Sequence, residues 1–392
     1  MHSLTPNILF VGAEDDSLDL FEGQYPIPNG VSYNSYLIRD SRSAIIDSVD
    51  ARRTADWLAA IEAALPGLEA APEYLVVQHM EPDHSGSVRA LAERFPDIKI
   101  VCTAKAAAML GNFFEGFDFA TRAVIVGDGD TLSLGNVTLQ FITAPMVHWP
   151  EVMMTLDLTD GVLFSADAFG TFGMSNSATG DAWDFEARRY YTNIVGRFGA
   201  SVQGVMKKIK DLKFGVVAPL HGPVLRENLA HYWHLYDRWS RYEPETRGVM
   251  VAYASVYGGT AEAARRLAAI LRNEGAGEVV LFDLCRHDVS YAVSEAFRLS
   301  HIVLCSVTYD GDIFPAMHDF LHHLQRKNLG ARTFGLVENG SWAPVAARIM
   351  TEMVSKLKDT KIVAPTVTLR SRLHHDDIPT LQALARELVS TL

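Results

Sequence analysis

A short stretch early in the chain carries side chains of the kinds that bind metal ions. Four candidate ligands fall within six positions: His79, Glu81, Asp83 and His84. They directly follow the apolar run Tyr74–Val77, which predicts a buried strand. Pro82 and Gly86 oppose an immediate regular continuation, so the imidazoles and carboxylates would lie on a rigid edge beside a loop. Such an edge can hold metal.

The spacing of these side chains favours two ions over one. Alternate residues of an extended segment point the same way, which predicts that His79, Glu81 and Asp83 project together while His84 turns to the other side. Two imidazoles and two carboxylates cannot complete two coordination spheres, so further ligands are required downstream. Three candidates each follow a short apolar segment: His148, Asp167 and His221.

This ligand series resembles that of the flavodiiron proteins, whose catalytic domain has the metallo-β-lactamase fold. The resemblance implies that Asp167 bridges two irons and that the other ligands form two sets: His79, Glu81 and His148 for one iron, and Asp83, His84 and His221 for the other. At His84, water in place of the imidazole is left open as the alternative. Zinc hydrolases of that fold carry a second His where this chain has Glu81. An added carboxylate favours a harder, redox-capable metal such as iron.

Composition and charge limit the remaining possibilities. At 392 residues, with 48% apolar residues, the chain is long enough for two domains that each bury a core. The net charge of −12 argues against binding to nucleic acid or to an anionic membrane. No stretch has the apolar length to span a bilayer and the N-terminus lacks a secretory pattern, which predicts a cytoplasmic protein. Cys102, Cys285 and Cys305 form no C-x-x-C pair and are predicted to be buried thiols.

Strands and helices alternate in the first part of the chain. Strands are expected over 7–11, 35–39, 43–47 and 98–102, and helices over 57–65, 88–95 and 104–110, the first of which should stop at Pro66-Gly67. Several short strands between residues 123 and 164 fit two sheets between helices. The segments 185–209 and 226–242 have helical periodicity. The first should pack Tyr190 and Tyr191 in the core, and the second leaves open a further metal site at His231 and His234.

The charged segment 241–248, which contains Pro and Gly, predicts a domain boundary between residues 247 and 248. Beyond it, apolar strands alternate with helices; the strands are expected over 249–253, 278–282, 301–305, 334–337 and 361–363. This alternation predicts a doubly wound parallel sheet that binds its ligand at the carboxyl ends of the strands.

The loop after the first of these strands suits a phosphate group. It lies before a helix over 261–272, so free N–H groups and the helix dipole favour an anion there; its residues are Ser255, Val256, Tyr257, Gly258, Gly259 and Thr260. Thr260 is expected to cap the helix. The loop matches neither G-x-G-x-x-G nor a P-loop, which weakens dinucleotide and triphosphate binding and leaves an ordinary strand–helix turn as an alternative. Two later loops offer hydroxyl groups, backbone groups and aromatic walls for a flavin ring: Ser306, Thr308, Tyr309 and Asp310, and Asn339, Gly340, Ser341 and Trp342.

This part resembles flavodoxin, and the order of the two parts matches the flavodiiron family over essentially the whole chain. The expected fold class is α/β: an αββα metallo-β-lactamase-like sandwich over 1–247, then a flavodoxin-like sheet of five parallel strands over 248–392. The resemblance implies FMN beside the two irons. It also implies the minimal two-domain class, which depends on a separate electron donor such as rubredoxin. The ring loop departs from the Gly-Ser-Tyr-Gly-Trp type of many members, so the residue that stacks on the flavin is left open.

Two functions compete. In the first, FMN feeds electrons to a non-haem diiron site that reduces O₂ to water or NO to N₂O. In the second, Zn²⁺ in the first domain hydrolyses an ester, amide or thioester, and the flavodoxin-like part is a binding module. Glu81 and the flavin loops favour the first, because a hydrolase has no use for flavin. The resemblance further implies a head-to-tail homodimer, or a higher assembly of such dimers such as a tetramer, in which the flavin of one subunit lies beside the diiron site of its partner.

Overall fold

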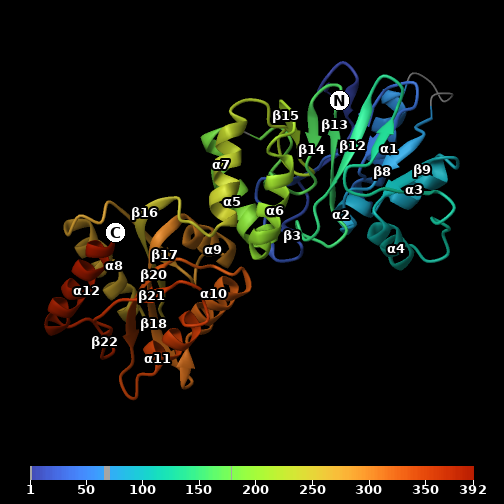
Figure 1. The fold of residues 1–392 in the computed structure, drawn as a ribbon. Coiled ribbons are helices and arrows are strands. Elements are labelled where there is room, and N and C mark those ends of the chain that lie inside the picture. Colours follow the sequence, from blue (N-terminus) through green and yellow to red (C-terminus); the bar gives the residue numbers. More distant parts are fainter. Residues whose placement is uncertain (1, 66–70, 178) are drawn as a thin grey trace. The chain divides into compact units, whose positions relative to one another are not determined.

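The computed structural model describes residues 2–65, 71–177 and 179–392 (Figure 1). Contacts between residues divide the chain into two compact units: Met1–Tyr191 with Ala200–Asp237, and Thr192–Gly199 with Arg238–Leu392. The functional boundary after residue 247 stays a prediction. No helix in the described ranges combines the length and the apolar character that crossing a membrane requires.

Two facing sheets form the centre of the first unit. The strands of one sheet follow the order β1-β6-β7-β8-β9-β10: Ile8–Phe10, Tyr36–Ile38, Ala44–Ile46, Tyr74–Val76, Lys99–Cys102 and Ala123–Ile125. The other has the order β11-β12-β13-β14-β15: Thr131–Ser133, Thr138–Thr143, Met153–Asp157, Val162–Phe164 and Val216–Ala218. Ile46 and Val76 of the first sheet share one buried core with Phe141 and Phe164 of the second. Two short ribbons pair β2 with β5 and β3 with β4: Ala13–Asp15, Val31–Tyr33, Leu20–Phe21 and Tyr25–Pro26.

Helices cover the outer faces of these sheets. Figure 1 shows α1, α3 and α4 beside the first sheet: Thr54–Ala64, Val88–Arg94 and Ala104–Phe113. Helices α5 and α7 lie beside the second: Asp181–Tyr190 and Leu229–Ser240. The predicted αββα sandwich is therefore confirmed. The predicted stop of the first helix at Pro66-Gly67 lies outside the described residues.

The segment 185–209 does not form one continuous helix. Helix α5 passes into a π-helical stretch over Tyr191–Val195 and a 3₁₀ turn over Gly196–Phe198 before α6 begins at Gly199–Ile209. A Cβ atom on Gly199 would lie 2.3 Å from the carbonyl oxygen of Ser240, so only glycine lets these backbones approach. Apolar periodicity cannot reveal such a break, because the contact comes from a residue distant in sequence.

The second unit has one sheet whose five main strands are parallel, in the order β17-β16-β18-β20-β21. Strand β22 pairs parallel with β20, and the short β19 pairs antiparallel with β18. In chain order from β16 to β22 the strands are Thr246–Ala254, Glu278–Asp283, Leu299–Tyr309, Asp312–Ile313, Thr333–Asn339, Lys361–Ile362 and Val367–Leu369. Alternate residues of β16 point to opposite faces. Met250 packs in the core beneath α9, α10 and α11, and Val251 packs beneath α8 and α12. These helices, from α8 to α12, are Gly259–Asn273, Val289–Arg298, Pro315–Arg326, Ala346–Val354 and Ile378–Thr391. The predicted doubly wound sheet is confirmed.

One of the three predicted buried thiols is exposed. Cys102 and Cys305 are buried, but Cys285 is exposed, so that part of the prediction was wrong. Strand β17 ends at Asp283 and the chain turns there, with the Cys285 N–H donating to Asp283 Oδ1 at 2.9 Å. The apolar run before Cys285 gave no sign of this turn.

Candidate functional site

The predicted metal ligands come together at the ends of strands. His79 follows β8, whereas Asp167 and His221 follow the parallel neighbours β14 and β15 and leave the same sheet edge. The candidate ligands form two groups, in each of which the ligand atoms lie within 4.8 Å of one another: His79, Glu81, His148 and Asp167, and Asp83, His84 and His221.

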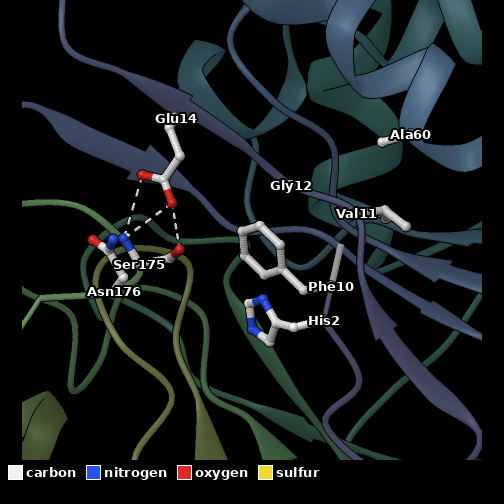
Figure 2. Close-up of a pocket in the computed structure, with 8 residues that line it drawn as sticks. All are labelled: His2, Phe10, Val11, Gly12, Glu14, Ala60, Ser175 and Asn176. Carbon is white, nitrogen blue, oxygen red and sulfur yellow. Dashed lines mark hydrogen bonds between the residues drawn. The ribbon is translucent and has the colours of Figure 1, made fainter.

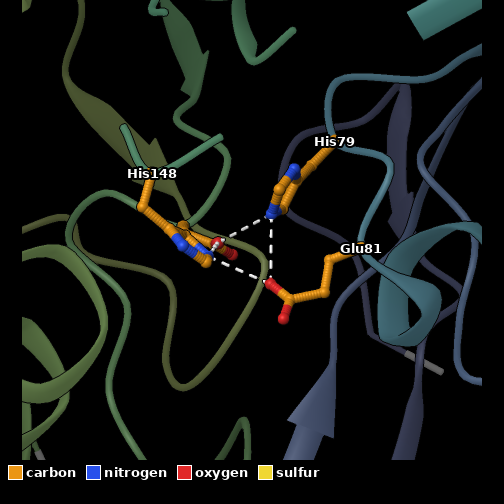
Figure 3. A group of neighbouring side chains, drawn as sticks. His79, Glu81 and His148 are labelled. Carbon is orange, nitrogen blue, oxygen red and sulfur yellow. Dashed lines mark hydrogen bonds and ion pairs between the residues drawn. The ribbon is translucent and has the colours of Figure 1, made fainter. Parts of the chain in front are cut away.

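In the first group, His79, Glu81 and His148 point toward one another (Figure 3). Glu81 Oε2 lies 3.2 Å from His79 Nε2 and 3.0 Å from His148 Nε2. Asp167 Oδ2 lies 3.3 Å and 3.0 Å from the same two nitrogen atoms. Two imidazoles and two carboxylates thus surround a space that an ion could fill.

Asp167 connects this group with the second. Its other oxygen, Oδ1, lies 3.2 Å from His84 Nε2 and 3.9 Å from His221 Nε2. Asp83 Oδ2 lies 3.5 Å and 3.3 Å from those same nitrogen atoms. A carboxylate that offers one oxygen to each group has the arrangement of a bridging ligand.

The grouping differs from the one expected for an extended segment. Residues Pro82–Ser85 form a helical turn, α2, with proline at its favoured first position. This turn carries both Asp83 and His84 to the second group, so the prediction that Asp83 projects with His79 and Glu81 was wrong. The two groups coincide with the ligand sets that the family resemblance implies, and ligation itself stays a prediction.

The donor set fits cations. His79, His84 and Asp167 are each at most 1% exposed. Buried atoms without a well-aligned hydrogen bond include both carboxylate oxygens of Asp83 and of Asp167 and the Nε2 atoms of His84 and His221. Burying such groups without partners costs free energy. Buried imidazole nitrogens and carboxylate oxygens that face one another in this way are suited to ions between them.

Buried carboxylates such as these are stabilised in their charged form by positive charge beside them. Burial alone would lower the pKa of His148, but its contacts with Asp167 and Glu81 raise that pKa to about 9. Burial would raise the pKa of Asp167, but the surrounding imidazoles, His79 foremost, hold it well below its usual value. Cations that displace the imidazole protons would supply the same charge balance.

Two outer partners orient the imidazoles. His79 Nδ1 lies 2.8 Å from Glu151 Oε1, which also accepts the N–H of Met80 at 2.9 Å. His221 Nδ1 donates to the carbonyl oxygen of Ser32 at 2.7 Å. Both contacts leave Nε2 available to a metal. Sequence reasoning missed them, although a carboxylate so soon after His148 was a usable signal for Glu151.

Asp47, directly after β7, holds the backbone of the ligand segment. It is fully buried with a positive φ of 51°. Its Oδ1 accepts the N–H groups of Gln78 and His79 at 2.8 and 3.3 Å, and its Oδ2 accepts Gln78 Nε2 at 2.9 Å. Burial raises the pKa of Asp47 to about 6 despite these bonds. The sequence marked this residue only as the end of a strand.

A pocket of about 270 Å³ reaches the ligands from the surface. Its lining combines the segment around β3 with a turn beside Tyr33 and with the ligand segment: Leu18, Leu20, Phe21, Glu22, Gly23, Tyr33, Asp50, Arg52, Glu81, Pro82 and Asp83. Tyr190 is buried, as predicted, and its ring centroid lies 5.6 Å from that of His221. A pocket of this size suits a small substrate.

The second unit has a pocket of about 790 Å³ at the carboxyl ends of its strands. Most predicted flavin residues line it: Ser255, Val256, Tyr257, Gly259, Thr260, Thr308, Tyr309, Asp310, Asn339, Gly340, Ser341 and Trp342. Gly258 and Ser306 are not among the lining residues. Gly258 supplies the left-handed turn before α8, with φ 90°, and the buried Ser306 hydroxyl donates to the Val307 carbonyl at 3.2 Å. A pocket of this size, with aromatic walls and a helix N-terminus, fits FMN.

Thr260 does not cap α8, contrary to the prediction. The helix begins at Gly259, and Ser255 Oγ accepts the N–H groups of Gly258 and Ala261, each at 3.2 Å. Thr260 Oγ1 instead accepts Asn339 Nδ2 at 3.2 Å. Sequence reasoning also missed Ser371 and Arg372, which line the pocket after β22 and belong to no motif.

Two other places carry no comparable chemistry. A hollow of about 520 Å³ in the first unit (Figure 2) is lined by His2, Phe10, Val11, Gly12, Glu14, Ala60, Ser175 and Asn176. There Glu14 is bonded to Ser175, and His2 stacks on Phe10 at 4.9 Å. His231 bonds Asp184 at 2.7 Å, and neither His231 nor His234 belongs to a cluster of three candidate ligands among the described residues.

Comparisons with known proteins agree with this geometry. Residues 31–222 match the family model described as ODP family beta lactamase. The type A flavoprotein fprA of Rhodobacter capsulatus is 32% identical over 95% of this chain and 86% of its own length. A nitric oxide reductase of Moorella thermoacetica is 29% identical over 100% of this chain and 98% of its own. Among solved structures, the rubredoxin oxygen:oxidoreductase of Desulfovibrio gigas has a TM-score of 0.93 at 25% identity, over 100% of this chain and 98% of that one.

Proposed function

The chain belongs to the flavodiiron family, and from this membership we infer that it is an oxidoreductase in which FMN and a non-haem diiron site reduce a diatomic gas, O₂ or NO. Relatives carry the names nitric oxide reductase and rubredoxin oxygen:oxidoreductase, so the family includes proteins named for each gas. The preference of this chain between the two gases is left open.

The proposal rests on the position of the Asp167 carboxylate between the two ligand groups. Its two oxygens turn toward two separate ligand groups, which supports a pair of ions. Glu81 adds a carboxylate to the first group and thereby favours iron. The zinc hydrolase is the weaker candidate, because hydrolysis does not require a flavin and so leaves the pocket of the second unit unexplained.

The residues have distinct roles in this proposal. His79, Glu81 and His148 would hold one iron, Asp83, His84 and His221 the other, and Asp167 both. Bound FMN and iron would supply the electrons, which side chains cannot store. Glu151 and the Ser32 carbonyl orient the imidazoles of His79 and His221, and the small pocket beside Glu81 and Asp83 limits the substrate to a small molecule.

The electron donor is proposed to be rubredoxin or a similar small carrier. The working assembly is proposed to be a head-to-tail homodimer or a tetramer built from two such dimers. Support comes from aromatic side chains left open at the flavin pocket: Tyr257 is 97% exposed, Trp342 81% and Tyr309 44%. Exposed aromatic residues are typical of surfaces that a partner covers. A cytoplasmic location stays a prediction.

A mixing experiment tests the assembly. A His79→Ala chain should be inactive, and a Gly259→Ala chain, assayed without added FMN, should lose most of its activity. Their mixture, after subunit exchange, should recover activity if the flavin of one subunit serves the metal site of the other. Sedimentation of the holoprotein gives the oligomeric state. A fully active monomer would refute the dimer.

Cofactor analysis tests the function itself. Protein produced with iron supplied should contain about two irons and about one FMN per chain, and should consume O₂ or NO when a reductant feeds the flavin. Acid extraction should release FMN. Stoichiometric zinc in active protein, or extraction of FAD, would contradict the proposal.

A further inference from the structure

Glu338 is a buried carboxylate directly before the loop that would hold the flavin ring. It is 8% exposed, near the end of β20, and is followed by the ring loop, residues 339–345. It does not line the flavin pocket. A glutamate is unexpected at this buried position, because burying a charged side chain costs free energy unless hydrogen bonds compensate for the lost water.

Two hydrogen bonds hold this carboxylate. Glu338 Oε2 accepts the N–H of Ala347 at 2.9 Å, and Oε1 accepts the hydroxyl of Thr368 at 2.8 Å. Ala347 lies in the first turn of α11, which follows the ring loop, and Thr368 lies on β22. A negative charge at the positive end of a helix is favourable, and a charged acceptor strengthens both bonds.

The ring loop is fastened at both ends by such bonds. At its start, the Asn339 side chain donates to Thr260 Oγ1 at 3.2 Å and to the Ser371 carbonyl at 3.0 Å. At its end, Thr308 Oγ1 accepts the N–H groups of Val345 and Ala346 at 3.0 and 3.2 Å. Glu338 takes the next N–H of the same helix end, so the last residues of the loop and the start of α11 have a fixed path.

We propose that Glu338 is a positioning residue for the flavin ring: without touching the flavin, its carboxylate ties the start of α11 to β20 and β22 and so fixes the 339–345 loop in the form that binds the ring. The inference rests on the proposed FMN site. It explains how this chain orders a ring loop with the sequence Asn-Gly-Ser-Trp-Ala-Pro. Only the ring, and not the phosphate, should depend on Glu338.

The contributions of the ring and of the phosphate can be separated by measuring the affinity of the apoprotein for FMN and, in a second titration, for riboflavin, which has the ring without the phosphate. Glu338→Leu removes the charged acceptor of the half-buried Ala347 N–H and of the hydroxyl of Thr368, an exposed residue, and losing these two bonds costs about 1–3 kcal/mol. It should therefore weaken FMN and riboflavin alike by roughly 5- to 100-fold, with their affinity ratio unchanged. Glu338→Gln keeps an acceptor for Ala347 and can donate to Thr368, so it should stay within about 3-fold of the wild type. The readout is quenching of flavin fluorescence.

Three further variants serve as comparisons. Thr368→Val should reproduce part of the Glu338→Leu loss. Ser255→Ala, in the phosphate loop, should weaken FMN more than riboflavin. Glu352→Gln is the matched control, because this exposed carboxylate on the same helix pairs with Arg348 and makes no bond to the ring loop among the described residues. It should bind both flavins as the wild type does.

Three results would overturn the inference. The first is wild-type flavin affinity in Glu338→Leu, and the second is a loss of affinity for FMN but not for riboflavin. The third is a Glu338→Gln variant that binds both flavins as weakly as Glu338→Leu does. Should the leucine variant fail to fold, as judged by its iron content and circular dichroism, Glu338→Gln and Thr368→Val still decide the question. Wild-type apoprotein that bound neither flavin would refute the proposed function, and this inference with it.

Discussion

The two sites of this molecule are built on opposite principles. The metal ligands are buried side chains that face one another before any ion is added: His79, His84 and Asp167 are each at most 1% exposed. The flavin pocket is formed by loops, and Tyr257 and Trp342 on its rim are 97% and 81% exposed. The first site is set by the packing of its own unit, whereas the second leaves aromatic surface exposed at the rim of its pocket. A substitution in one site should therefore abolish or weaken ligand binding at that site and leave ligand binding at the other site unchanged.

The largest effect should come from the bridging carboxylate. Asp167→Ala removes the one residue that faces both ligand groups, so iron should fall from about two per chain to near zero, and turnover should be abolished. FMN should stay bound at the wild-type level. Metal analysis and the flavin absorbance of the same sample check both halves of the statement. Loss of FMN in this variant would break the separation of the two sites.

The converse change lies in the phosphate loop. A Cβ atom on Gly259 would lie 2.2 Å from the carbonyl oxygen of Ser371, so Gly259→Ala must push these segments apart. Overpacking of about 1–3 kcal/mol should weaken FMN binding roughly 5- to 100-fold while iron content stays unchanged. Flavin titration and metal analysis measure both.

Gly204→Ala is the control for that change. No atom lies within 4 Å of the added Cβ position on Gly204, which lies within α6. The variant should bind FMN normally and gain up to about 1 kcal/mol of stability, because alanine favours a helix over glycine. Equal FMN loss in both glycine variants would show that the loop contact is not the cause.

A smaller effect is expected for the outer partner of His79. Glu151→Gln retains an acceptor for the Met80 N–H but removes the negative charge beside His79 Nδ1. Loss of such an outer partner should weaken metal binding about 10- to 100-fold. Competition with a chelator measures this, and Glu93→Gln, an exposed carboxylate paired with Arg89, is the control. If both variants held metal equally well, the metal site would not depend on its surroundings as proposed.

The sequence predicted the metal site better than the flavin site for a physical reason. Metal ligation needs imidazole and carboxylate side chains, so His148, Asp167 and His221 stand out by type. Flavin binding uses backbone groups and shape, so nothing marked Ser371 or Arg372, and Ser255 instead of Thr260 supplies the bonds at the start of α8. Both sheets were predictable from apolar alternation. The helical turn at Pro82–Ser85 and the break before Gly199 were not, because each depends on local geometry or distant contacts.

The smallest expected effect is a pH dependence in the flavin unit. His301 is 3% exposed, and burial, with the charges of Arg247 and Lys361, lowers its pKa to about 4. The unfolded chain, with a pKa near 6.5, therefore binds more protons between these values, so the free energy of unfolding falls as the pH drops below about 6.5. The loss at pH 5 should be up to about 2 kcal/mol.

Denaturant unfolding of the full chain at pH 7 and pH 5, followed by flavin release, measures this dependence. His301→Gln removes the titrating group and should lose less stability between the two pH values than the wild type. An identical pH dependence in both proteins would contradict the assignment.

The most direct test of the account is a rapid-mixing experiment with NO. The reduced, iron-loaded protein is mixed anaerobically with NO while the flavin absorbance is followed, beside Asp167→Ala protein that carries reduced FMN but no iron. We expect the flavin of the iron-loaded protein to reoxidise as N₂O forms, or, if O₂ is the preferred substrate, the same protein to reduce O₂ to water without releasing hydrogen peroxide. The flavin of the Asp167→Ala protein should stay reduced under NO, and with O₂ it should yield hydrogen peroxide. Equal rates and products in the two proteins would contradict the claim that the diiron site is where the gas is reduced.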